Sequence, residues 1–103
     1  MALSNNATVT ELRLKLFVAG DSPRARQAAE NLARACEAFL PGEVEVETVD
    51  VLVDPHQADE YRVLTTPTVV RVAPLPRRRA TGDLADATQL LAALAIHPTR
   101  STQ

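Results

Sequence analysis

Few side chains in this chain of 103 residues could perform covalent or metal chemistry. The single cysteine, Cys36, excludes an internal disulfide framework and a site built from several cysteines. The two histidines, His56 and His97, have no cysteine or carboxylate partners at metal-ligand spacing. Ser22 precedes Pro23, a pair typical of a helix start, and that role accounts for the serine. The sequence therefore predicts no catalytic residue, no metal site and no cofactor.

Charged residues are instead segregated along the chain. Seven acids and no Lys or Arg lie between Glu43 and Glu60, whereas arginines and no acid lie between Val69 and Gly82. Two interpretations stay open: both runs are solvated surface, or the acidic patch meets a basic one, between copies of this chain or with a partner. The net charge of −2 argues against general nucleic-acid binding.

Hydrophobic periodicity and turn signals predict seven elements. Alternating apolar residues are typical of strands, and apolar residues three or four apart are typical of helices. In order, we expect a strand at 12–18, a helix from Pro23 to the Pro41-Gly42 break, a strand at 43–53, a short helix at 55–63 after Asp54, strands at 69–72 and 77–81, and a helix from Ala87 that begins with a capping box of Asp86 and Gln89 and closes before Pro98.

The long predicted helix has an apolar stripe and a charged face. On the charged face, Arg26, Glu30 and Arg34 are spaced to form i,i+4 pairs. The stripe that we expect to be buried consists of Ala25, Ala28, Ala29, Leu32, Cys36 and Phe39.

The strand predicted at 43–53 contains a change of alternation. Val44 and Val46 share one face with the glutamates on the other, but Val49, Val51 and Val53 then take the glutamate positions. Either a bulge falls near Thr48, or the second half of the strand is buried on both faces.

The element order predicts an α/β fold of the thioredoxin-like type, βαβαββα. A strand–helix–strand unit requires parallel strands, whereas the short connection within 69–81 suits an antiparallel hairpin. We expect one domain at 11–97 between disordered tails at 1–10 and 98–103. With no apolar run of about 20 residues and no signal pattern, the expected location is the cytoplasm, away from membranes.

A thioredoxin-like enzyme needs a thiolate where the first strand meets its helix, because the helix N-terminus lowers the thiol pKa. Residues 21–25 occupy that place and contain no cysteine. Cys36 falls on the apolar stripe more than about three turns further along, where we expect an unreactive, buried thiol. The sequence therefore argues against a redox enzyme.

Four motifs resemble the KaiB family, which is known for small circadian-clock proteins. The resemblance covers Leu12 to Ile96, and the motif spacings fit without gaps. The motifs are Leu-Phe-Val-Ala-Gly at 16–20, Val-Asp-Val-Leu-Val-Asp-Pro at 49–55, Leu-Thr-Thr-Pro-Thr at 64–68 and Gly-Asp-Leu-Ala-Asp at 82–86.

The resemblance implies a non-enzymatic clock protein that binds a KaiC-type ATPase and modulates its phosphorylation cycle and output signalling. It also implies competition with a histidine kinase that carries a KaiB-like sensor domain, and contact with KaiA where that protein exists. Glu47 stands where a basic residue is common in the family, and aromatic residues usual near its strand ends are missing. An adaptor in stress signalling with a different partner therefore stays open as an alternative.

The family's basic positions indicate the expected partner contacts. Arg71 occupies such a position in the third strand, and Arg78 and Arg79 lie in the arginine-rich segment before Gly-Asp-Leu. On the outer face of the first helix we add Arg24, Arg26 and Gln27. If Arg71 is such a contact, Arg71→Glu is expected to weaken partner binding without changing the circular dichroism spectrum.

The family also implies two folds. A resting homo-oligomer, a dimer or tetramer, has its second half rearranged to βαββααβ, and a thioredoxin-like monomer captures the partner. X–Pro bonds are nearly balanced between cis and trans, so Pro67 (the expected cis proline), Pro74 and Pro76 are candidate switch positions. Ala93 and Ala95 stand where relatives carry Gly and Asp in the last helix, and alanine's higher helix propensity is expected to favour the thioredoxin-like form.

Overall fold

The computed structural model describes residues 12–40 and 44–96, and within them it has the predicted element order. The predicted tails at 1–10 and 98–103 lie outside the described residues. Within residues 12–40 and 44–96, no helix is long and apolar enough to cross a membrane. The elements are β1 (Leu12–Val18), α2 (Pro23–Phe39), β2 (Val44–Asp50), α3 (Pro55–Glu60), β3 (Thr68–Ala73), β4 (Arg78–Thr81) and α4 (Ala87–Ala93).

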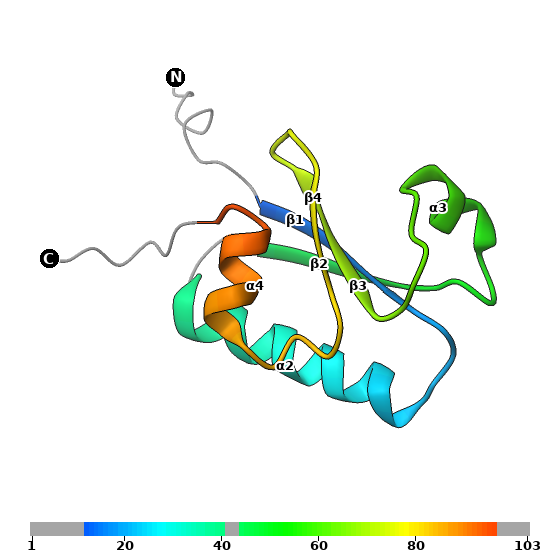
Figure 1. The fold of residues 1–103 in the computed structure, drawn as a ribbon, viewed down its shortest axis with the longest axis horizontal. Coiled ribbons are helices and arrows are strands. Elements are labelled where there is room, and N and C mark those ends of the chain that lie inside the picture. The colour runs from blue at the N-terminus through cyan, green and yellow to red at the C-terminus, as the bar shows by residue number, and fades with distance from the viewer. Residues whose placement is uncertain (1–11, 41–43, 97–103) are drawn as a thin grey trace, which may run out of the picture.

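The strands form one sheet in the order β2-β1-β3-β4. β2 runs parallel to β1, β3 runs antiparallel to β1, and β4 runs antiparallel to β3. Helices α2 and α4 lie on one face of the sheet, and α3 lies at the far end of the sheet (Figure 1). This is the thioredoxin-like architecture that the sequence predicts.

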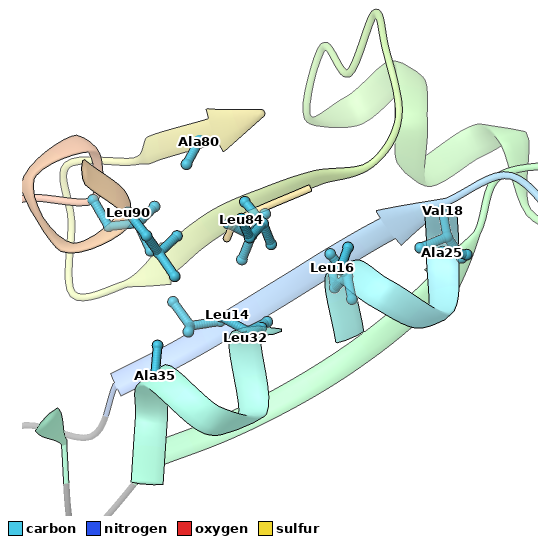
Figure 2. Close-up of a cluster of buried hydrophobic side chains, with 12 residues drawn as sticks. Leu14, Leu16, Val18, Ala25, Leu32, Ala35, Ala80, Leu84 and Leu90 are labelled. Carbon is cyan, nitrogen blue, oxygen red and sulfur yellow. The ribbon is translucent and has the colours of Figure 1, made fainter. Parts of the chain in front are cut away.

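Alternating strand residues build a separate core on each face of the sheet. On the helix-covered face, Leu14 and Leu16 of β1 pack with Leu32 of α2 and Leu90 of α4 (Figure 2). On the opposite face the core is small, and its buried members are Phe17, Val49, Tyr61 and Val70. We call the first side the α2/α4 face and the second the Tyr61 face.

Helix α2 begins as predicted, because the Ser22 Oγ accepts a hydrogen bond from the Ala25 N–H at 3.1 Å. Its buried stripe differs from the prediction, since Ala29 is exposed. Asn31 is buried instead, and its Nδ2 donates to the Asp83 carbonyl at 2.8 Å, joining the helix to the β4–α4 loop. The buried residues of α2 are Ala25, Ala28, Asn31, Leu32 and Ala35.

The predicted charge pairs along α2 do not form. Arg26 instead pairs with Asp21 at 2.8 Å in the loop that precedes the helix. Arg34 donates to the Asn31 side chain at 3.2 Å. The outer face of α2 is therefore a solvated surface on which Arg26 is paired at the helix start.

Neither explanation offered for the second strand is correct. The β1–β2 register is continuous, so there is no bulge, and Thr48 is exposed rather than buried. β2 ends at Asp50, and Val51 begins a turn. Val49 takes a glutamate position because it packs into the small core with Phe17 and Tyr61. The change of alternation therefore marks the residue of β2 that belongs to this core.

Three prolines that the sequence singled out border β3 and the β3–β4 turn. The Thr66–Pro67, Ala73–Pro74 and Leu75–Pro76 peptide bonds are cis. Exchange with a βαββααβ arrangement stays a prediction.

Helix α4 starts at its predicted cap and ends earlier than the sequence suggested. The Asp86 carboxylate accepts the Gln89 N–H at 3.1 Å, as the capping box predicts. Ala93 is the last helical residue, and Ala95 follows in the left-handed region at φ 55°. The helix-propensity argument is therefore wrong at Ala95, because L-residues with a Cβ are disfavoured in that region.

The two alanines are consequently expected to respond to glycine with opposite signs. Ala95→Gly should raise the free energy of unfolding by about 0.5–1 kcal/mol, because glycine adopts positive φ without a Cβ clash. Ala93→Gly should lower it by up to about 1 kcal/mol through lost helix propensity. Urea unfolding followed by circular dichroism measures both, and a similar loss at the two positions would contradict the left-handed conformation at Ala95.

Candidate partner-binding surface

Three connections meet at one end of the sheet, where β1 and β2 end and β3 begins (Figure 1). The Asp50 carboxylate ties two of them together, because it accepts the N–H groups of Gly20 at 2.9 Å and Leu52 at 3.0 Å. Gly20 has φ 73°, and its backbone lies so close to Leu52 that a Cβ would lie 3.4 Å from the Leu52 Cδ1. These hydrogen bonds therefore hold the β1–α2 and β2–α3 connections together at this end of the sheet.

Large apolar side chains stand uncovered at this end. Leu52 is 71% exposed, Val53 79% and Leu64 95%. We call these three residues the apolar rim. They belong to the connections on either side of α3, and exposed apolar side chains that lie together are a feature of interaction surfaces. Sequence reasoning missed Leu52 and Val53 because it placed both within the strand predicted at 43–53, and it offered no signal for Leu64.

A shallow cleft of about 80 Å³ lies at the same end of the sheet. It lies between the start of α2 and the loop before β3, and its lining includes Ser22, Arg24, Thr66 and Pro67. This is the place where a thioredoxin-like enzyme would carry its reactive thiol, and Ser22 occupies it as a helix cap. The cleft has the position of a redox site without the nucleophile.

Cys36 lies on the α2/α4 face, partly buried against the core, and away from the cleft. Burial raises the pKa of the Cys36 thiol, which disfavours the reactive thiolate. Within residues 12–40 and 44–96, no three His, Cys, Asp or Glu side chains are grouped to hold a metal.

The loop beside the rim has a capping geometry that differs from the prediction. Asp54 precedes α3, but its carboxylate makes no side-chain bond to the helix backbone. It accepts the Gln57 Nε2 at 2.9 Å, and this hydrogen bond is the main reason that the pKa of Asp54 lies below its ordinary value.

The predicted contacts on α2 lie at the surface. Arg24, Arg26 and Gln27 are all exposed in the first turns of the helix. Arg24 also lines the cleft, whereas Gln27 donates to Asn31 at 3.3 Å. Of these three side chains, Arg24 is the one that reaches the cleft near the apolar rim.

Arg71 does not present its charge at the surface. Its side chain points to the α2/α4 face and the residue is only 8% exposed. The guanidinium donates from Nη1 to the Ala95 carbonyl at 3.1 Å and from Nη2 to the Pro76 carbonyl at 2.9 Å. Arg71 therefore joins the end of α4 to the β3–β4 turn, and in this fold it is a structural residue.

Strand alternation separates the neighbouring arginines. Arg79 lies on the Tyr61 face and donates to the carbonyls of Tyr61 and Arg62, while the exposed Arg78 pairs in register with Arg71. Arg77, which sequence reasoning did not select, stacks its guanidinium 4.3 Å from the centre of the Tyr61 ring. The six predicted contacts therefore do not form one surface.

Comparison with known proteins shows similarity to one family. Residues 15–96 match the family model described as the KaiB domain. The chain is 41% identical over 81 residues to the circadian clock oscillator protein KaiB of Synechococcus elongatus, covering 79% of each chain. It is 36% identical over 85 residues to circadian clock protein KaiB3 of Synechocystis, covering 82% of this chain and 83% of that protein.

Solved structures show the same fold. The N-terminal domain of Synechococcus elongatus SasA superposes with a TM-score of 0.73 at 27% identity, covering 92% of this chain and 93% of the domain. Mitochondrial thioredoxin 3 of Saccharomyces cerevisiae superposes with a TM-score of 0.64 at 21% identity, covering 88% and 83%. The second likeness is one of fold alone.

Proposed function

The chain belongs to the KaiB family, and from that premise we propose that it is a cytoplasmic, non-enzymatic clock regulator. In this proposal it binds a KaiC-type ATPase and modulates the ATPase's phosphorylation cycle and output signalling. The relatives named above are circadian clock proteins, which supports the clock role.

One observation carries the proposal: the redox position of a thioredoxin-like fold holds a capping serine and lies at the same end of the sheet as uncovered apolar side chains. A surface without a nucleophile cannot exchange a disulfide, because the thiolate is the attacking group. When a partner covers exposed leucines beside a cleft, apolar surface leaves water and the free energy of the complex falls. We therefore place the ATPase contact at the apolar rim and Arg24.

The likeness to the SasA domain supports the second part of the proposal. Two chains with one fold can present equivalent surfaces to the same site on a partner. We propose that this chain competes for the ATPase with a KaiB-like sensor domain of an output kinase. KaiA is proposed as a further partner in organisms that have it.

The proposal also includes a resting homo-oligomer in which the second half of the chain has the βαββααβ arrangement. The described fold is then the capture form. The segment that would have to re-pair contains β3 and β4, the strands bordered by Pro67, Pro74 and Pro76.

Leu64→Glu tests the rim directly. We expect this substitution to weaken ATPase binding at least about tenfold, because burying an apolar anchor is often worth more than 1 kcal/mol and a carboxylate reverses that gain. Folding should be unaffected, since exposed substitutions usually change stability by less than about 0.5 kcal/mol. Size-exclusion chromatography and calorimetry with a KaiC-type ATPase and ATP measure the binding.

Leu75→Glu is the matched control. Leu75 is 74% exposed, but it lies in the β3–β4 turn at the opposite end of β3. It should bind as the unmodified chain does. Equal losses in the two variants would contradict a contact at the rim. If the unmodified chain binds none of the KaiC-type ATPases of its own cell, the proposed function is overturned and the adaptor with another partner is favoured.

A further inference from the structure

The connection that carries Leu64 begins with a tight turn at the C-terminal end of α3. The Arg62 N–H donates to the Asp59 carbonyl at 3.2 Å, and the Val63 N–H donates to the Ala58 carbonyl at 2.8 Å. These two bonds form the Schellman pattern, in which the residue after the cap adopts the left-handed conformation. Arg62 adopts it at φ 56°, although glycine is the usual residue there because it has no Cβ. The turn is therefore made by a residue that does not favour it.

Packing does little to hold α3 in place. None of the residues of this helix is buried. The buried residue is the next one, Tyr61, whose ring packs against Phe17 and lies under the guanidinium of Arg77. A packed ring fixes where Tyr61 lies, but the direction of the chain after it depends on its backbone bonds.

Arg79 of β4 binds the backbone at this point. Its Nη1 donates to the Arg62 carbonyl at 2.7 Å, and its Nη2 donates to the Tyr61 carbonyl. Both oxygens lie at or just after the C-terminus of α3, where a cation is favoured because the last carbonyls carry partial negative charge. Two parallel donors of one guanidinium suit two successive carbonyls, and the ammonium of a lysine does not reproduce that geometry.

The other end of the connection is also held by a side chain of the sheet. The Thr65 carbonyl accepts a hydrogen bond from the Oγ1 of Thr68, a buried residue of β3, at 2.7 Å. Leu64 therefore lies between two carbonyls, those of Arg62 and Thr65, that are each bound. Because Leu64 is almost fully exposed, its position depends on this backbone and not on packing of its own side chain.

We propose that Arg79 is a positioning residue for the apolar rim. By binding the Tyr61 and Arg62 carbonyls, it keeps Leu64 in the place where a partner meets it. The inference rests on the proposed function, because it takes the rim as the ATPase contact. In this role Arg79 does not touch the partner, unlike the contact that the sequence predicts. It orders the loop before binding, so that less of the binding free energy is lost in ordering it.

Arg79→Ala removes both donors. We expect this variant to raise the Kd for a KaiC-type ATPase about three- to tenfold, because the apparent affinity falls with the fraction of chains whose loop is competent to bind. Arg79 is exposed, so its truncation leaves no cavity in the core. The matched control is Arg34→Ala, which removes the same charge from the exposed surface of α2 and should bind as the unmodified chain does. Calorimetry measures both affinities.

Hydrogen exchange tests the positioning in the free chain, without any partner. In Arg79→Ala the amides of Arg62 and Val63 should exchange at least about fivefold faster, because the turn that protects them opens more often. The amides of α2 should keep their rates. A general loss of stability would instead raise the exchange rates in both places.

Arg62→Gly supplies a rescue that a direct contact by Arg79 would not allow. Glycine adopts the left-handed conformation without a Cβ clash, so the turn should form without the bonds from Arg79. The double variant Arg62→Gly/Arg79→Ala should therefore recover most of the lost affinity and of the lost exchange protection at Val63. Arg79→Lys should recover less, because one ammonium does not serve both carbonyls.

Three results would overturn the proposal. Arg79→Ala could bind with unchanged affinity, or its exchange rates could rise equally in α2 and at Val63. The double variant could stay as weak as Arg79→Ala, which would indicate that Arg79 touches the partner itself. A failure of the proposed function is separate: if the unmodified chain binds no KaiC-type ATPase, the exchange rates at Arg62 and Val63 still decide whether Arg79 holds the loop.

Discussion

Arg71→Glu is expected to lower the free energy of unfolding by about 3–5 kcal/mol, the cost of an uncompensated buried charge. The new carboxylate would face the carbonyl oxygens of Ala95 and Pro76, which now accept hydrogen bonds from the guanidinium. A carboxylate cannot donate to them, and its burial adds a desolvation penalty. Urea unfolding followed by circular dichroism measures the loss. This replaces the expectation, drawn from the sequence, that the spectrum stays unchanged.

Two further variants separate this effect from charge alone. Arg78→Glu makes the same substitution at the exposed neighbour in register on β4, and it should change stability by no more than about 0.5 kcal/mol. Arg71→Lys keeps the charge but loses the planar fork that reaches two carbonyls, at a cost of about 1 kcal/mol. If Arg71→Glu unfolds at the same urea concentration as Arg78→Glu, the buried position of Arg71 is wrong.

Phe17→Ala is expected to cost about 3–5 kcal/mol, the range for removing a buried aromatic ring. Phe17 is fully buried and belongs to the small core on the Tyr61 face, where its ring centre lies 5.7 Å from that of Tyr61. Small domains have about 5–15 kcal/mol in total, so the variant should lose a large part of its stability. Thermal unfolding by calorimetry checks this result.

The loss should also show where the Tyr61 face is anchored. Tyr61 leads into the loop that carries Leu64, so amides at 61–66 should exchange hydrogen faster in Phe17→Ala while those of α2 are less affected. Phe17→Leu is the control, since it retains most of the apolar volume and should cost only about 1 kcal/mol. An alanine variant as stable as the leucine variant would contradict the packing of this core.

Local signals explain which elements could be predicted from the sequence. The Ser22 cap, the Asp86 cap and the alternation of β1 each depend on residues within a few positions of one another. Hydrogen bonds at helix starts and side-chain periodicity act over that range. The order βαβαββα and the parallel β1–β2 pair were confirmed for that reason.

The hydrophobic pattern did not predict where two elements end, because individual hydrogen bonds fix those ends. The valines after Asp50 alternate like a strand, but Asp50 accepts the Leu52 N–H and turns the chain. Helix α4 was predicted to continue through Ala95, but the chain leaves the helix after Ala93 and the Ala95 carbonyl is bound by Arg71. An alternating or apolar pattern does not indicate where such a contact interrupts it.

The amino-acid sequence alone determined that the thioredoxin-like position has a serine in place of a thiol, because the type of residue there decides whether a nucleophile exists. It also determined the alternation that divides Arg78 from Arg79. Only the tertiary structure decided that Arg71 is buried while Leu64 is exposed. The physical reason is that exposure depends on which segments fold over a side chain. Arg71 pairs in register with Leu14 of β1 and donates to the carbonyl of Ala95, 24 residues away, and no local pattern contains that information.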